Sequence, residues 1–224
     1  MNQSGMKSVV TFDAAGTLIR LTQSPGKTYA EAARVFGYDL DPDRIESGFR
    51  KAWKVLPARM DTLGPRPDDD KGWWFELVGQ ALREAGYRVE PMESYFEGLY
   101  RGYALPGAWE LLPDVSEVLE ALAAKGIRLG VLSNFDRRLY DVLEHLGIRD
   151  RFEHILISSE VGSDKPGVRI FLEGVRRFGV GPEEVLHVGD DPILDGAGAK
   201  AAGLAVLIID HQANRLNRVL ELVE

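Results

Sequence analysis

Five short apolar runs, each leading into polar or acidic residues, most strongly limit how this chain can fold. They are rich in Val, Ile and Leu, and most are continuous rather than alternating. That pattern is typical of strands buried on both faces of a parallel sheet. We predict strands in the segments SVVTFDA (8–14), IRLGVLSN (127–134), HILISSE (154–160), EVLHVGDD (184–191) and LAVLIID (204–210).

Helical patterns separate these runs in the second half of the chain. After Asp114, a candidate N-cap with Glu117 three residues on, apolar residues recur at helical spacing as far as Gly126. The pattern begins again at Asp136, and a third helix is predicted over 167–178. Strands that alternate with helices indicate an α/β fold with a doubly wound, mainly parallel, Rossmann-like sheet.

Residues 19–108 break this alternation, because no run in them predicts a strand. Many aromatic residues gather there, and we expect most of them to form the core of a small helical bundle. We predict helices over 26–36, 42–56, 71–85 and 91–103. The expected organisation is a Rossmann-like catalytic core from residues 1–18 and 109–224, with 19–108 inserted as an all-helical cap over the sheet.

Composition removes several classes of function. The chain has no cysteine, which excludes disulfides and thiolate chemistry, and none of its four histidines has a zinc-like paired spacing (His145, His154, His187 and His211). A formal net charge of −8 disfavours a nucleic-acid partner, since such proteins usually carry a basic face. The start MNQSGMKSVV lacks the features of a secretory signal, and no run approaches the roughly 18 apolar residues of a membrane span. We therefore expect a cytoplasmic protein with no nucleic-acid or membrane partner.

Side chains that can take part in catalysis or binding follow four of the predicted strands. Asp13 ends the first run, Ser133 and Asn134 end the second, Lys165 follows the third, and an acidic group including Asp190 follows the fourth. In open α/β sheets, ligands bind outside the carboxyl ends of the strands. A parallel sheet would therefore bring a carboxylate nucleophile, a hydroxyl, a cation and further acids to one edge.

This ordered set resembles the four motifs of the haloacid dehalogenase superfamily of hydrolases. The first motif, DxxGT, matches residues 13–17, Ser133 in VLSN matches the second, Lys165 in KPGVRIF the third, and GDDPILD (189–195) the fourth. The resemblance covers the whole chain, including a helical cap between the first two motifs. The stretches SNFDRRL and GFRKAW are also similar to a narrower branch, the haloacid dehalogenase-like hydrolase domain-containing proteins.

The resemblance implies a role for each of these side chains. Asp13 would attack the substrate and form a covalent aspartyl intermediate. Ser133 would donate a hydrogen bond to a transferring phosphoryl oxygen, and Lys165 would neutralise charge between nucleophile and phosphoryl group. Thr17 and Asn134 are expected to contact the substrate, which the resemblance makes a small phosphorylated molecule.

A Mg²⁺ cofactor is also implied by the resemblance. Its ligands would be the carboxylate of Asp13, the backbone carbonyl of Ala15 and the carboxylate of Asp190, with Asp195 outside the first sphere or bound through water. Mg²⁺ prefers such oxygen ligands. The sequence carries no indication of the oligomeric state.

Ala15 departs from the pattern of most phosphatases in this superfamily. They carry an aspartate two residues after the nucleophile, which protonates the leaving group and then activates water. Alanine can do neither, and proton transfer by a positioned group typically contributes roughly 10²–10⁴-fold. A metal would not be affected, because the family uses only the backbone carbonyl at this position.

Four functions remain open on this basis. One is a phosphohydrolase that takes a proton from the cap or the substrate, or that acts on a good leaving group. A second is carbon–phosphorus cleavage, since the phosphonoacetaldehyde-hydrolysing branch also has alanine here; it needs a cap lysine, for which Lys51 and Lys54 are candidates. A third is carbon–halogen cleavage, whose branch reads DAxGTL and needs no Mg²⁺. The last is a non-catalytic binding or scaffold protein on the same fold.

Overall fold

The computed structural model describes residues 7–210 and 215–223. The N-terminal residues 1–6 and His211, which entered the sequence argument, lie outside the described residues. Among the helices that are described, none is both long enough and apolar enough to cross a bilayer.

The chain forms two compact units. Unit 1 comprises the residues up to Arg20, the short segment Met60–Arg66 and the residues from Glu110 onward. Unit 2 comprises Leu21–Arg59 and Pro67–Trp109. Because Met60–Arg66 belongs to unit 1, the chain passes between the units four times.

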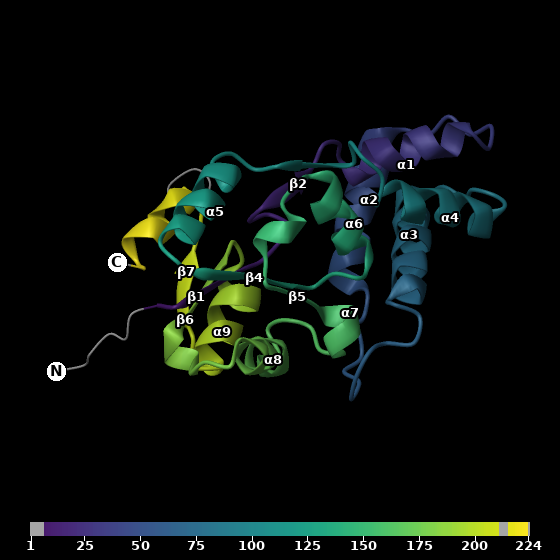
Figure 1. Ribbon diagram of the computed structural model, residues 1–224. Helices are drawn as coiled ribbons and strands as arrows, with labels where there is room; N and C mark the ends of the chain where they lie inside the picture. The colour runs from purple at the N-terminus through teal and green to yellow at the C-terminus, as the bar shows by residue number, and fades with distance from the viewer. Residues whose placement is uncertain (1–6, 211–214, 224) are drawn as a thin grey trace. The chain divides into compact units, whose positions relative to one another are not determined.

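Unit 1 is built on a five-stranded sheet in which every neighbouring pair of strands is parallel, in the order β5-β4-β1-β6-β7 (Figure 1). The central strand is β1, where Val9 pairs with Arg128 on one side and with Val185 on the other. Each strand lies within a predicted apolar run, so the predicted α/β parallel sheet is confirmed. The strands are β1 (Val9–Phe12), β4 (Arg128–Ser133), β5 (His154–Ile157), β6 (Val185–Gly189) and β7 (Ala205–Ile208).

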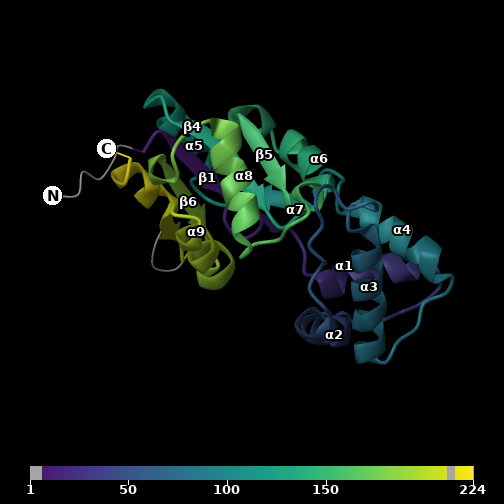
Figure 2. The same cartoon turned by 90° about the horizontal axis from the view of Figure 1, so that it is seen from below.

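Helices cover both faces of this sheet. Figure 1 shows α5 and α6 on one side and α8 and α9 on the other, and Figure 2 shows α8 and α9 in front when the sheet is seen from below. Leu132 and Leu156 of the sheet form one buried cluster with Ile170 and Phe171 of α8 and Ala199 of α9. The α-helices of unit 1 are α5 (Val115–Ala124), α6 (Arg138–His145), α7 (Ser158–Val161), α8 (Val168–Phe178) and α9 (Gly198–Ala201). Three 3₁₀ turns lie at Arg149–Arg151, Pro182–Glu184 and Leu216–Glu221, and a π-helical turn lies at Pro192–Ala197.

Two local predictions in unit 1 were wrong. The run HILISSE is not a strand throughout: β5 ends at Ile157, and the residues from Ser158 form α7. Asp114 precedes α5, but its side chain makes no capping hydrogen bond. Its backbone is left-handed, with a φ of 66°, whereas a capping residue needs an extended backbone to turn its oxygen toward the helix.

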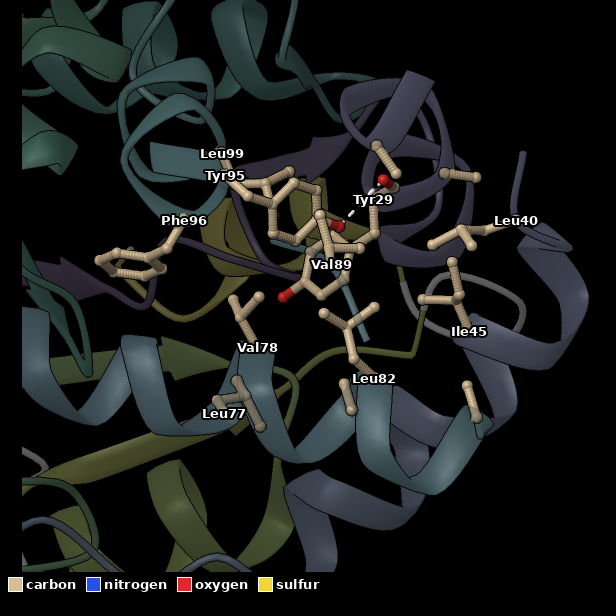
Figure 3. Packing of buried hydrophobic residues seen from close by; sticks show 14 of the residues in the cluster. Tyr29, Leu40, Ile45, Leu77, Val78, Leu82, Val89, Tyr95, Phe96 and Leu99 are labelled. Carbon is tan, nitrogen blue, oxygen red and sulfur yellow. Dashed lines mark hydrogen bonds between the residues drawn. The ribbon is translucent and has the colours of Figure 1, made fainter. Parts of the chain in front are cut away.

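Unit 2 contains the four predicted helices, α1 (Pro25–Arg34), α2 (Pro42–Val55), α3 (Lys71–Ala85) and α4 (Met92–Gly102). Their apolar faces form one core (Figure 3), in which the Tyr95 hydroxyl donates to the carbonyl oxygen of Tyr29 at 3.0 Å. Trp73, Trp74 and Phe75 pack against this core, as expected of aromatic residues in a small bundle. Trp53 is instead half exposed.

Two strands of three residues, β2 (Ile19–Leu21) and β3 (Trp109–Leu111), form a small separate sheet. The change from unit 1 to unit 2 falls within β2, and the return falls within β3. The sequence did not predict either strand, because three residues are too few for a periodic pattern to appear.

Candidate active site

The parallel sheet brings four of the predicted residues into direct contact. Asp13 follows β1, Ser133 is the last residue of β4, Lys165 lies in the loop after α7, and Asp195 lies in the turn after β6. Because all the strands are parallel, their carboxyl ends share one edge. Asp13 thereby meets Ser133 and Lys165, which lie 120 and 152 positions away in the chain.

Asp13 is the centre of this group. Its Oδ1 accepts a hydrogen bond from Ser133 Oγ at 3.0 Å and another from Lys165 Nζ at 2.5 Å. Its backbone N–H donates to the carbonyl oxygen of Val188 at 2.9 Å, which fixes the residue to β6. Within residues 7–210 and 215–223, Oδ2 accepts no hydrogen bond, so its lone pairs are not used by the protein itself.

Lys165 lies between two carboxylates. Its ammonium donates to Asp13 Oδ1 at 2.5 Å and to Asp195 Oδ1 at 2.6 Å, and only 3% of the residue is exposed. Burial alone lowers the pKa of Lys165, but the charges of Asp13 and Asp195 outweigh burial and raise that pKa above its ordinary value. The lysine is therefore held as a cation against the proposed nucleophile.

Asn134 holds the backbone on which Lys165 stands. Its side-chain amide donates to the Lys165 carbonyl oxygen at 2.9 Å, and its Oδ1 accepts from the Lys165 backbone N–H at 2.7 Å. The sequence argument assigned Asn134 to the substrate. In the structure, both hydrogen bonds of its amide group go to the loop that presents the lysine.

The turn after β6 carries the acidic residues of the fourth motif. Asp191 accepts hydrogen bonds from the backbone N–H groups of Ile193 and Leu194 and thereby begins a π-helical turn over Pro192–Ala197. Such turns are rare and frequently lie at functional sites. The turn brings Asp195 directly over Gly189, where any side chain larger than hydrogen would collide with its carboxylate.

Asp13, Asp190 and Asp195 form a cluster in which one ligand atom from each lies within 4.8 Å of the others. Asp190 is surface-exposed as a residue, but its carboxylate lies against Gly16 and accepts a hydrogen bond from Thr17 Oγ1 at 3.4 Å. Burial of this carboxylate, together with the charges of Asp13 and Asp195, raises the pKa of Asp190. Crowded carboxylates repel one another, and a divalent cation would relieve that repulsion.

The turn after Asp13 requires a glycine at position 16 and leaves the side chain of Ala15 exposed. Gly16 has a φ of 94°, a left-handed conformation that favours glycine, and a side chain there would strike Asp190. Ala15 is exposed, and its methyl group has no proton to give. Among the described residues, no backbone N–H donates to the Ala15 carbonyl, since the amides of this turn bond to Ala14 and Ile19.

Two buried residues next to the site, His187 and Thr11, were not assigned a role from the sequence. His187 of β6 donates through Nε2 to Asp195 Oδ1 at 3.1 Å, and its Nδ1 lies 3.0 Å from Thr11 Oγ1 of β1. Burial is the main reason that the pKa of His187 is lowered. A polar residue inside an otherwise apolar strand is the sequence signal for such a buried contact, whereas the spacing of the histidines bears only on a zinc site.

A segment between α2 and α3 also reaches the loop that carries Lys165. The Arg66 backbone N–H donates to the Ser159 carbonyl at 2.7 Å, and the Thr62 backbone N–H donates to that of Gly162 at 2.8 Å. The Arg66 guanidinium donates to Asp164 Oδ1 at 3.2 Å through two of its nitrogens. We call Met60–Arg66 the strap.

Comparisons with known proteins agree with this geometry. A family model described as haloacid dehalogenase-like hydrolase matches residues 7–203. The human protein named haloacid dehalogenase-like hydrolase domain-containing protein 3 is 34% identical over 208 residues, which cover 92% of this chain and 83% of the human one.

Two solved structures share the fold. The L-2-haloacid dehalogenase from Xanthobacter autotrophicus has a TM-score of 0.70 at 24% identity, over 93% of this chain and 80% of that one. A predicted phosphoglycolate phosphatase from Haemophilus somnus has a TM-score of 0.68 at 23% identity, over 97% and 98%. These likenesses show the fold alone, and they reach a dehalogenase and a predicted phosphatase equally.

Proposed function

The chain belongs to the haloacid dehalogenase-like hydrolases, and we propose that it is a Mg²⁺-dependent hydrolase that acts through Asp13 on a small phosphorylated metabolite. One observation carries the proposal: Asp13 Oδ1 accepts from both Ser133 and Lys165, Oδ2 accepts no hydrogen bond from the described residues, and the carboxylates of Asp190 and Asp195 lie close by. A hydroxyl, an ammonium and an acidic cluster around one carboxylate are the groups that phosphoryl transfer needs for positioning and charge stabilisation.

The donor set fits Mg²⁺. The carboxylates of Asp13 and Asp190 and the backbone carbonyl of Ala15 would hold the ion, and all of these are the hard oxygen ligands that it prefers. Asp195 Oδ1 is already bonded to Lys165 and His187, which supports a place for Asp195 outside the first sphere. When bound, Mg²⁺ supplies positive charge that stabilises the phosphoryl oxygens in the transition state.

The covalent steps use residues of this chain. Asp13 attacks phosphorus, and an oxygen–phosphorus bond forms as the bond to the leaving group breaks, with its electron pair staying on the leaving oxygen. Ser133 and Lys165 orient the phosphoryl group and offset its charge. Water then attacks the phosphorus of the aspartyl phosphate, and the oxygen–phosphorus bond to Asp13 breaks with its electron pair returning to the carboxylate. The proton lost by the water leaves with the inorganic phosphate or passes to solvent.

Ala15 restricts the substrate class. No acid stands at this position to protonate the leaving oxygen, so the reaction favours substrates whose leaving group is stable as an anion. Acyl phosphates and aryl phosphates meet this requirement, whereas a simple sugar alkoxide does not. We therefore place such activated phosphates first among the candidates.

The alternative chemistries have less support. Lys51 and Lys54, the candidates for a Schiff base with phosphonoacetaldehyde, are both exposed on α2. Carbon–halogen cleavage is favoured by Ala15, but it gives no use to the acidic cluster after β6. A non-catalytic scaffold would need neither the buried Lys165 nor its contact with Asp13, and even a paired buried charge gives no more stability than well-packed apolar side chains usually would.

The proposal is tested by assaying the purified protein on acetyl phosphate, p-nitrophenyl phosphate and a panel of sugar phosphates, with and without Mg²⁺. We expect Mg²⁺-dependent turnover that is highest on acetyl phosphate and lost in Asp13→Asn, which keeps the size of the side chain but removes the nucleophile. Halide release from 2-haloacids without metal is the matched assay for the dehalogenase alternative. Absence of turnover on every phosphate, or equal rates for parent and Asp13→Asn, would overturn the proposal.

A further inference from the structure

His187 is a fully buried polar residue in the central part of the sheet. It lies on β6 directly opposite Thr11 of β1 in the parallel register, and 0% of it is exposed. Its ring packs edge-to-face against Phe171 of α8, with centroids 5.1 Å apart. An apolar side chain would fill such a place at lower cost, because a buried polar group costs free energy unless its hydrogen bonds are made.

The hydrogen bonds of His187 define its tautomer. Asp195 is a carboxylate and can only accept, so the proton of the ring must be on Nε2, 3.1 Å from Asp195 Oδ1. In the neutral ring Nδ1 is then an acceptor, and the Thr11 hydroxyl, 3.0 Å away, donates to it. Thr11 thus orients His187, and His187 donates to Asp195.

Asp195, held in place by His187, in turn positions the Lys165 ammonium. Its Oδ1 accepts from both His187 and Lys165, and its Oδ2 accepts from the backbone N–H of Asp191 at 3.1 Å. With three donors around it and Gly189 beneath it, the carboxylate has one position. The ammonium that contacts Asp13 therefore lies at the end of a chain of hydrogen bonds that begins on strand β1.

We propose that His187 is a positioning residue: by donating to Asp195, it holds the carboxylate that keeps the Lys165 ammonium against Asp13. This inference rests on the proposed function at one point only, the role of Asp13 as the nucleophile. It adds that the lysine, although carried by a loop, takes its position from the sheet. Outer groups that orient a charged residue of a site typically contribute about 10–100-fold to activity.

The test compares three variants by a signal that does not depend on catalysis. A buried, hydrogen-bonded ammonium exchanges its protons slowly, so ¹⁵N–¹H spectra report the Lys165 ammonium directly, and Lys165→Met assigns the signal. His187→Gln keeps an N–H donor at similar reach, His187→Leu removes it, and Thr11→Val removes only the hydroxyl that orients the ring. We expect the ammonium signal to persist in His187→Gln and to be shifted and broadened by faster exchange in His187→Leu, with an intermediate change in Thr11→Val.

Kinetics and folding complete the experiment. On acetyl phosphate with Mg²⁺, we expect His187→Leu to lower kcat about 10–100-fold with little change in KM, and His187→Gln to restore most of it. Circular dichroism checks that each variant folds, and Thr11→Val carries the test if His187→Leu does not. An ammonium signal that is absent from the parent, or unchanged in every folded variant without the donor, would overturn the inference. A signal that depends on His187 in a protein that turns over no phosphate would support the inference and reject the proposed function instead.

Discussion

Arg66 and Asp164 form a partly buried ion pair in the loop that presents Lys165. The pair lies 98 residues apart in sequence, and the two guanidinium nitrogens lie 3.2 Å from the same carboxylate oxygen. The Arg66 side chain is 6% exposed and that of Asp164 is 19% exposed. The residue before the lysine is thus fixed by a strap from a distant part of the chain.

Removal of one partner should destabilise the protein. We expect Arg66→Met, which keeps the apolar stem, to lower the free energy of unfolding by about 1–3 kcal/mol, because a buried carboxylate loses its charged partner. Urea unfolding measures this change. The double variant Arg66→Met with Asp164→Asn should recover part of the loss, since it also removes the negative charge that Arg66 offset. If Arg66→Met alone is as stable as the parent, the ion pair does not hold the strap.

Ser133 should matter for the rate far more than for stability. We expect Ser133→Ala to reduce kcat on acetyl phosphate by roughly 10²–10³-fold, the typical loss when one preorganised donor to a reacting oxygen is removed. Its stability should change by only about 1 kcal/mol, because Lys165 still pairs with Asp13. Ser133→Thr keeps the hydroxyl and is the matched control. Equal kcat in parent and Ser133→Ala would remove Ser133 from the proposed machinery.

Ala15→Asp should show whether the missing acid is the only departure from an ordinary phosphatase. Ala15 is exposed, so the substitution should change stability by no more than about 0.5 kcal/mol. We expect turnover of sugar phosphates, whose leaving groups need a proton, to rise by roughly 10²–10⁴-fold, and turnover of acetyl phosphate to rise much less. Ala15→Asn has the same size without the proton and should give no gain. Equal effects of the two substitutions would contradict this explanation.

Asp190→Asn should have opposite effects on the metal-free and the metal-bound protein. Without metal, removing one of three crowded carboxylates relieves repulsion and should raise the unfolding temperature. With Mg²⁺, the parent should gain stability, by about 2.7 kcal/mol at a concentration 100-fold above the Kd, and the variant should gain little. Thermal unfolding with Mg²⁺ or with a chelator measures both. A variant that responds to Mg²⁺ like the parent would exclude Asp190 as a ligand.

Glu173 on α8 should contribute to acid stability. The Arg176 guanidinium, at 2.8 Å, and that of Arg177 outweigh burial and lower the pKa of Glu173 to about 2. Since its ordinary value is 4.5, the unfolded chain takes up this proton first as the pH falls. The contribution is therefore full above about pH 4.5 and is lost toward pH 2. Glu173→Gln should therefore be less stable than the parent near neutral pH, and this difference in the free energy of unfolding should shrink as the pH falls from 4.5 to 2. The exposed control Glu183→Gln should differ from the parent by the same amount at every pH.

The parts of the fold that the sequence predicts well are those with a local pattern. The five strands and the helices of both units follow from apolar runs and helical periodicity, and the meeting of Asp13, Ser133 and Lys165 follows once the sheet is parallel. The boundary at Ile157 was misplaced, because Ser158 and Ser159 continue a run without a break signal. β2 and β3 are simply too short to leave a pattern.

The supporting residues of the site were not predictable in the same way. Thr11 and His187 are two polar residues on different strands, and only the register of β1 with β6 makes them neighbours. The sequence around Arg66 gives no indication that this arginine is buried or that it pairs with Asp164. Such partners depend on tertiary placement, which composition and spacing do not encode.

The pairing of β1 with β4 and β6 has a consequence for the order in which the molecule comes into being. β1 is synthesised before both of its neighbours in the sheet, so Val9 can pair only after Arg128 and Val185 have been made. All of unit 2 is synthesised between β1 and β4 and has its own core, so it can fold while β1 is still unpaired. Asp13 and Lys165 meet across 152 residues, and contacts of such long separation form slowly. Asp13 is thus made long before the residues that surround it, and its contacts in the site are among the last to form.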